Sequence, residues 1–214
     1  MKKHIICFGD SNTHGYCADP TDCADGGNRF NENERWTCLL QKFIGDDYLV
    51  IEEGLGGRTT IFDDPYHEGL SGLDYIIPCL LSHEPIDLLI IMLGTNDTKA
   101  RFNANAANIS VGLQRLINKA KGSSAWGGKK PNILVIAPPH IHAEFVDVYM
   151  GEGCIEKSRE VAKYYEEVCK NNGYAFLDAE GIAEFNQKDH MHLTRKGHFD
   201  LANRLKDIVP KLVL

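Results

Sequence analysis

The chain has 214 residues, 43% of them hydrophobic, and carries a formal net charge of −7 at pH 7. This length suits one sizeable domain, and the negative charge, without any basic cluster that alternates with aromatic residues, excludes a surface that follows nucleic acid. No apolar run approaches the length of a membrane span, and the run after Lys2-Lys3 lasts only about five residues, shorter than a secretory signal requires. We therefore expect a cytoplasmic protein with no membrane or nucleic-acid partner.

Five apolar segments of strand length recur along the chain, each flanked by Gly, Pro or Asp. In chain order they are His4–Phe8, Tyr48–Ile51, Ile86–Leu93, Asn132–Ala137 and Tyr174–Leu177. Between them, apolar residues recur at intervals of three and four, as from Ile109 to Ala120 and from Ile155 to Cys169, which predicts amphipathic helices. This alternation predicts a five-stranded parallel sheet in a three-layer α/β/α sandwich, one domain over residues 1–214, with ligands at the carboxyl ends of the strands.

The first strand runs directly into Gly9-Asp10-Ser11, so Ser11 is expected to begin the first helix. A serine hydroxyl is a weak nucleophile at neutral pH and needs an imidazole to accept its proton and a carboxylate to orient that imidazole. At a helix N-terminus the N–H of Ser11 would be free to bind an oxyanion. Taken alone, such a turn is more often an ordinary helix cap than a nucleophile.

The ends of the second and third strands carry two candidate oxyanion donors. Gly57 follows the second strand and would offer its N–H without a side chain in the way, and Asn96 follows the third and would offer an uncharged side-chain amide. Each of them, alone, is more often part of a turn or a cap.

Asp189-x-x-His192 precedes the last predicted helix. The three-residue spacing lets the Asp189 carboxylate reach Nδ1 of His192, which leaves Nε2 free to face Ser11. The apolar face of the helix that follows is expected to consist of Phe199, Ala202, Leu205, Ile208 and Val209.

These four blocks fall at the ends of strands one, two and three and after strand five, where a single cleft collects them. Together they resemble the SGNH hydrolases, also called the GDSL esterase and lipase family. The matching blocks are Gly9-Asp10-Ser11, Gly57, Gly94-x-Asn96-Asp97 and Asp189-x-x-His192. The stretches 50–60 and 90–99 are similar to the bacterial arylesterase and acyltransferase subgroup of that family.

The resemblance implies a flavodoxin-like sandwich and a serine esterase that hydrolyses or transfers short acyl groups. It implies that Ser11 is the nucleophile, His192 the base and Asp189 the orienting acid, with an oxyanion hole from Ser11 N–H, Gly57 N–H and the Asn96 amide. It also implies no cofactor, and it suggests a homo-oligomer. The chain departs from the family pattern at Asn12, where Leu is usual, and at Gly56-Gly57, where the subgroup often has Ser-Ala; both departures are expected to affect the shape of the pocket.

Several further residues invite a role that we do not assign from sequence. His190 and His198 could form a metal site with Asp189, but hydration or capping explains them more simply, and His140-x-His142 is expected in a pocket wall rather than in a ligand pair. No metal is therefore expected. The seven cysteines include no C-x-x-C pair, which favours reduced thiols, and Cys17 and Cys23 are expected to be exposed in a polar loop.

Two alternatives remain open at this point. A two-metal phosphoesterase would need Asp-x-His on the first strand and Asn followed by His at the third, where this chain has Ile6-Cys7-Phe8 and Asn96-Asp97. A flavodoxin-like binding module would have the same sandwich fold but no catalytic activity, and it would not use the Asp189 and His192 pair.

Overall fold

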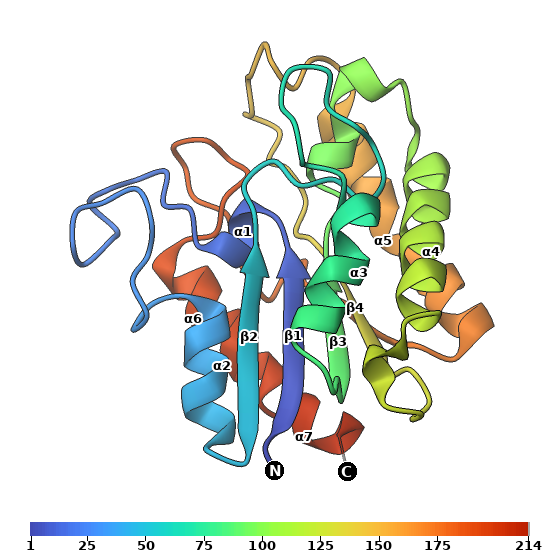
Figure 1. Ribbon diagram of the computed structural model, residues 1–214. Helices are drawn as coiled ribbons and strands as arrows, with labels where there is room; N and C mark the ends of the chain where they lie inside the picture. Colours follow the sequence, from blue (N-terminus) through green and yellow to red (C-terminus); the bar gives the residue numbers. More distant parts are fainter. Residues whose placement is uncertain (214) are drawn as a thin grey trace.

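The computed structural model describes residues 1–213 and contains a five-stranded, all-parallel sheet with the strand order β2-β1-β3-β4-β5 (Figure 1). The strands are β1 Lys3–Gly9, β2 Tyr48–Gly54, β3 Leu88–Met92, β4 Ile133–Ala137 and β5 Ala175–Asp178. All five predicted strands are present, and this order is that of the flavodoxin-like sandwich, so the predicted fold class is confirmed.

Helices cover both faces of the sheet (Figure 1). Helices α2 Trp36–Ile44, α6 Arg195–Leu205 and α7 Val209–Leu212 pack on one face, and α3 Gly72–Ser82, α4 Ala106–Lys121 and α5 Cys154–Asn172 pack on the other. Shorter elements follow strands or helices at α1 Ser11–His14, η1 Asn96–Thr98, η2 Ala100–Phe102 and η3 Ser124–Trp126. Among residues 1–213, no helix has the length and apolar character needed to cross a membrane.

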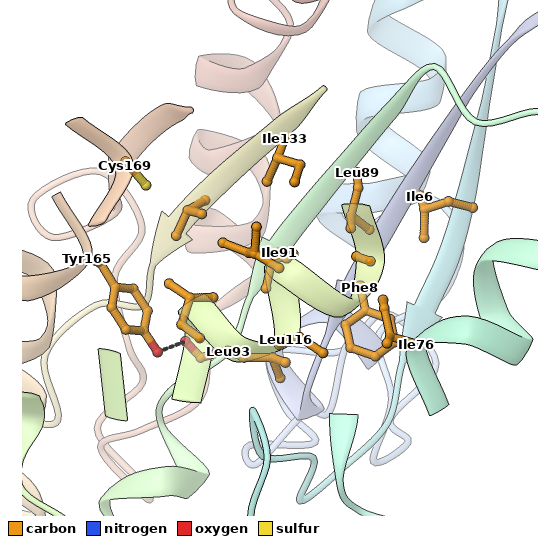
Figure 2. Packing of buried hydrophobic residues seen from close by; sticks show 14 of the residues in the cluster. Ile6, Phe8, Ile76, Leu89, Ile91, Leu93, Leu116, Ile133, Tyr165 and Cys169 are labelled. Carbon is orange, nitrogen blue, oxygen red and sulfur yellow. Dashed lines mark hydrogen bonds between the residues drawn. The ribbon is translucent and has the colours of Figure 1, made fainter. Parts of the chain in front are cut away.

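The core is divided between the two faces because side chains alternate along each strand. On β1, Ile6 and Phe8 face α3 and α4, whereas Ile5 and Cys7 face α2 and α6. All five residues of β3 are buried, as expected for a central strand covered on both faces. Figure 2 shows the hydrophobic cluster on the face covered by α3, α4 and α5. In this cluster the Tyr165 hydroxyl donates a hydrogen bond of 3.2 Å to the carbonyl oxygen of Leu93.

The C-terminal helix differs from its predicted form. α6 ends at Leu205, and a separate short helix, α7, begins at Val209. Pro210 lies in the first turn of α7, and proline is favourable at the start of a helix but not in its interior, which explains the break. Phe199, expected in the buried face, is 48% exposed and contacts Phe43 edge to face at 5.8 Å between ring centroids.

The loop after α1 also differs from expectation. Cys17 and Cys23, predicted to be exposed, are buried and pack with Phe30. Their surroundings in the sequence are polar, and only the folding of the loop over itself brings the three side chains together. All seven cysteines are free thiols.

The sheet register places the strand ends that matter for the site side by side. Gly9, the last residue of β1, pairs with Gly54 at the end of β2 and with Met92 at the end of β3. The segments that contain Ser11, Gly57 and Asn96 therefore leave the sheet at one edge, where the loops gather at the top of Figure 1.

Candidate active site

The structure brings Ser11, His192 and Asp189 into one chain of hydrogen bonds. The distance from His192 Nε2 to Ser11 Oγ is 2.8 Å, and the distance from His192 Nδ1 to Asp189 Oδ2 is 2.6 Å. Ser11 stands immediately after β1, and the other two residues lie in the loop between β5 and α6. A hydroxyl, an imidazole and a carboxylate in this order form the arrangement that activates a serine nucleophile.

Asp189 is held as an acceptor by its neighbours. Its Oδ1 accepts hydrogen bonds from Asn186 Nδ2 at 2.9 Å and from the backbone N–H groups of Met191 and His192 at 3.3 and 3.2 Å. Burial alone would raise the pKa of Asp189, but the hydrogen bond and charge of His192, together with these other donors, outweigh burial and lower it. Asp189 is thus a fixed carboxylate facing Nδ1.

Ser11 sits in a tight turn shaped by its neighbours. Asp10 caps α1, with its Oδ1 accepting the N–H of Asn12 at 2.9 Å. A Cβ on Gly9 would lie 2.0 Å from Thr13 Oγ1, so only glycine fits at the end of β1. Because α1 has only four residues, the N–H of Ser11 would act as a local hydrogen-bond donor and not as the end of a long helix dipole.

Gly57 and Asn96 lie beside this turn. Gly57 has φ +84°, which favours glycine, and its N–H makes no hydrogen bond to any other residue in the described range 1–213. Its neighbour Gly56 lies against Ser11, since a Cβ built there would be 4.0 Å from Ser11 Cβ. Asn96 Nδ2 donates to the Arg58 carbonyl at 3.2 Å and lies 3.5 Å from Asp10 Oδ2. These contacts place the Asn96 amide next to the residue that caps α1.

Arg58 was not identified as a site residue from the sequence, although it lies within the stretch similar to the arylesterase subgroup. Its buried guanidinium lies over the Phe8 ring at 4.3 Å and donates to the Gly9 carbonyl at 3.0 Å, while its own carbonyl accepts from Asn96. Arg58 therefore connects the loop of Gly57 with the ends of β1 and β3.

Two buried carboxylates lie behind the serine. Burial is the main cause that raises the pKa of Asp10 to about 6 and the pKa of Asp97 to about 6. Asp97 accepts the N–H of Thr60 at 2.9 Å and also binds the Thr60 hydroxyl. Asp97 thus fixes the loop after β2 to the loop after β3.

Asn12, which stands where the resemblance predicts Leu, contacts the loop that contains His192. Its side chain is 2% exposed; Oδ1 accepts the N–H of Leu193 at 2.9 Å, and Nδ2 donates to the carbonyl of Met191 at 3.2 Å. These two residues flank His192. Besides the expected effect on pocket shape, which stays a prediction, Asn12 links α1 to the segment that contains His192.

Replacing Asn12 with leucine should lower kcat/KM by about 10- to 100-fold, because a small displacement of His192 weakens proton transfer from Ser11. The variant should also unfold more easily, by about 1–3 kcal/mol, because a buried donor and a buried acceptor lose their partners. Steady-state kinetics and urea unfolding measure the two effects. Asn203→Leu on the exposed surface of α6 serves as the control, and unchanged kcat/KM in folded Asn12→Leu would rule out the positioning role.

An open depression of 470 Å³ adjoins the triad, with Tyr16, Phe145, Asp189 and His192 among its lining residues. The Tyr16 ring packs on the imidazole of His192 at 4.6 Å between centroids. A larger hollow of 880 Å³, which includes Tyr66, Lys99 and Tyr149, does not contain a member of the triad but shares Asp147 and Met191 with the first. The smaller depression is therefore the one that lies beside Asp189 and His192.

The remaining histidines fall into different environments. His198 is completely buried, which lowers its pKa to about 3, so the expectation of a hydrated histidine is wrong for it. Its Nδ1 accepts the N–H of Trp36, the first residue of α2, at 3.3 Å, which is a capping contact. His140 lies near Glu180, with 3.7 Å between Nδ1 and Oε2. His142 and His190 instead converge with Glu144 in a group whose spacing could hold a metal ion.

The chain is similar to several known proteins. The model of the GDSL-like lipase/acylhydrolase family matches residues 7–198. Among solved structures, the aryl esterase of M. smegmatis is 36% identical, with a TM-score of 0.88 and coverage of 98% of this chain and 99% of that one. Est24, a carbohydrate acetylesterase from Sinorhizobium meliloti, is 34% identical, with a TM-score of 0.88 and coverage of 99% and 100%. No curated protein matches the chain significantly.

Proposed function

Because the chain belongs to the GDSL-like lipase/acylhydrolase family, we propose that this hydrolase is a serine esterase acting on short acyl esters through an acyl-Ser11 intermediate. The observation that carries the proposal is the hydrogen-bonded chain from Ser11 Oγ through both nitrogens of His192 to Asp189. We assign the roles of nucleophile, base and orienting acid to these three residues in that order.

In the first step, Ser11 Oγ attacks the ester carbonyl carbon while His192 Nε2 accepts the hydroxyl proton. The resulting imidazolium gives this proton to the alcohol oxygen as the bond between carbon and that oxygen breaks, which leaves acyl-Ser11. A water molecule then attacks the acyl carbon and transfers a proton to His192. That proton returns to Ser11 Oγ as the carboxylic acid departs, and an alcohol in place of water would give acyl transfer from the same intermediate.

The oxyanion formed in each step would be stabilised by the N–H groups of Ser11 and Gly57 and by the Asn96 amide. Asn96 Nδ2 carries two hydrogens, and one of them is used by the Arg58 carbonyl. The second lies near Asp10 at a donor–acceptor distance of 3.5 Å, which is too long for a strong hydrogen bond. That hydrogen is therefore available to an oxyanion that forms beside Ser11.

Asn96→Ala should lower kcat about 100-fold or more, equivalent to about 3 kcal/mol of transition-state stabilisation, with a smaller change in KM. The loss falls mainly on kcat because the oxyanion exists only in the transition state and the intermediate. Asn118→Ala, on the exposed side of α4, is the matched control. A near-silent Asn96→Ala would remove Asn96 from the oxyanion hole.

For the substrate we propose aryl, alkyl or carbohydrate esters with short acyl groups. Support comes from the names of two similar structures, one an aryl esterase and one a carbohydrate acetylesterase. The side chains around His192 add to this support, because Tyr16, Phe145 and Met191 line the depression beside the imidazole and offer apolar groups for an acyl chain to contact.

A panel of p-nitrophenyl esters from acetyl to decanoyl, together with acetylated sugars, tests the substrate proposal. The value of kcat/KM should be highest for the shortest acyl chains and fall steadily beyond them. A preference for decanoyl over acetyl ester would contradict the short-acyl proposal without affecting the assignment of Ser11.

We also propose that the protein is a homo-oligomer. Apolar side chains stand out from the loops at the carboxyl edge of the sheet: Val146 is 90% exposed, Val148 85%, Tyr149 79% and Tyr66 73%. Exposed apolar patches of this kind favour association, and a second chain over these loops would narrow the entrance to the site. Sedimentation equilibrium measures the assembly, and a single species with the mass of one chain would contradict it.

We propose two further assignments. All five strands belong to one sheet, which supports a single hydrolase domain over residues 1–214. Seven free thiols suit a reducing compartment, which supports a cytoplasmic location. Limited proteolysis tests the single domain, which separately stable fragments would contradict. Cell fractionation tests the cytoplasmic location.

A further inference from the structure

Three side chains that the proposed ester chemistry does not use converge at the rim of the cleft. His142 and Glu144 lie in the loop after β4, and His190 lies in the catalytic loop between Asp189 and His192. One ligand atom from each of the three lies within 4.8 Å of the corresponding atoms of the other two. The residues come from segments nearly 50 positions apart in the sequence, so the fold itself creates the group.

The spacing of the two imidazoles matches metal coordination. His142 Nδ1 and His190 Nδ1 are 3.4 Å apart. Two ligands about 2.0 Å from a tetrahedral Zn²⁺ ion lie about 3.3 Å from each other, so both nitrogens already stand at the separation that the ion needs. The same separation is long for a hydrogen bond between the two rings. Glu144 is exposed and is free to rotate its carboxylate toward the two nitrogens.

The backbone fixes the two histidines relative to each other. The N–H of His142 donates to the carbonyl of His190 at 3.1 Å, which joins the two loops at the residues concerned. The N–H of Ile141 donates to Ser158 Oγ at 3.0 Å, which anchors the first loop to α5. His190 has φ +61°, a left-handed conformation that few residues other than glycine adopt and that is concentrated at functional sites.

We propose that His142, Glu144 and His190 form a binding site for a first-row divalent transition metal, with Zn²⁺ the best fit. Two imidazole nitrogens and one carboxylate suit Zn²⁺, Co²⁺ or Ni²⁺, whereas Mg²⁺ and Ca²⁺ require mainly oxygen ligands. Three protein ligands leave a fourth position open, as in metal sites that also bind water or a substrate group. Glu144 and His190 also line the 470 Å³ depression beside His192. This site revises the expectation that the two histidines have no ligand role.

A metal at this site would connect the loop after β4 to the loop that carries Asp189 and His192. Because the ligands are brought together only in the folded chain, the metal binds the folded state preferentially and stabilises it. The proposal does not depend on the esterase mechanism, since none of the three ligands belongs to the proposed triad.

The proposal is tested by two measurements on metal-free protein. Isothermal titration calorimetry with ZnCl₂ measures binding, and thermal unfolding with and without the ion measures stabilisation. Ser11→Ala provides the background, so that catalysis plays no part in the readout. We expect saturable binding of one Zn²⁺ per chain, a Tm higher by several degrees at saturating Zn²⁺, and no comparable effect of MgCl₂.

The ligand variants are His142→Ala, Glu144→Gln and His190→Asn, the last chosen because asparagine tolerates positive φ. Each should weaken Zn²⁺ binding at least tenfold. Loss of a residue that merely hydrogen-bonds to a metal ligand already lowers metal affinity about tenfold or more, and these variants remove a ligand itself. His140→Ala, two residues away on the same loop, is the matched control and should bind as the background protein does. No saturable binding, or equal binding in His142→Ala and His140→Ala, would overturn the proposal.

Discussion

Ser11→Ala is expected to lower kcat/KM for p-nitrophenyl acetate by about 10⁵- to 10⁶-fold, because no other group in the cleft replaces the attacking oxygen. The residual rate should still exceed that in buffer, since the amides of Ser11 and Gly57 and the side chain of Asn96 remain in place to bind an oxyanion. Stability should change little, because the variant removes one small hydroxyl whose side-chain partner, His192, lies beside the open depression.

The matched control is Ser82→Ala, which removes an exposed serine hydroxyl that bonds only within its own helix, α3. It should retain full activity. If folded Ser11→Ala keeps a tenth or more of the wild-type activity, Ser11 is not the nucleophile. Such a result would leave the Zn²⁺ proposal untouched, since that site is measured by binding.

Asp189→Asn is expected to lower kcat by about 10⁴-fold while leaving the fold intact. The carboxylate accepts a hydrogen bond from the N–H at Nδ1 of His192 and so keeps Nε2 unprotonated and able to receive the proton of Ser11. An amide in its place can donate to Nδ1, which would move the ring proton to Nε2 and remove the base. Steady-state kinetics with a short acyl ester measures the loss.

Asp207→Asn is the control for charge removal, because Asp207 is exposed on the turn between α6 and α7. Its kcat should equal that of the wild type. An Asp189→Asn variant with less than a tenfold loss would show that His192 does not depend on Asp189 for its tautomer. The orienting acid would then have to be sought elsewhere.

The strands and the Asp189–His192 pair could be predicted from sequence because both are encoded locally. β3 is a continuous run of apolar residues, as a strand covered on both faces requires, and Asp189 reaches His192 within one turn of chain. The positions of Ser11, Gly57 and Asn96 followed from the rule that parallel strands collect their following residues at one edge.

The residues that hold the site together could not be predicted in this way. Asn12 contacts the chain about 180 residues away, and nothing near it in the sequence indicates that the loop around His192 will fold against α1. The sequence around Arg58 is typical of a polar loop, but the side chain is buried against Phe8 once β1 and β2 are paired. His142 and His190 meet only because the loops after β4 and β5 lie side by side.

Two regions differ from the sequence prediction, and each has a local physical cause that the pattern of apolar residues does not indicate. The periodic residues from Phe199 to Val209 continue through a break that is set by Pro210, and Phe199 finds a partner in Phe43 on the protein surface instead of in the core. Cys17 and Cys23 are buried by the folding of a polar loop over Phe30, which no periodicity signals.

The central claim is that Ser11 is an activated nucleophile, and covalent labelling with a fluorophosphonate, followed by intact-mass and peptide mass spectrometry, tests it most directly. The reagent captures a serine whose proton is accepted by a neighbouring histidine. We expect one adduct per chain, located on Ser11, absent in Ser11→Ala and formed much more slowly in Asp189→Asn. Folded wild-type protein that remains unlabelled, or that carries the adduct on another residue, would contradict the account.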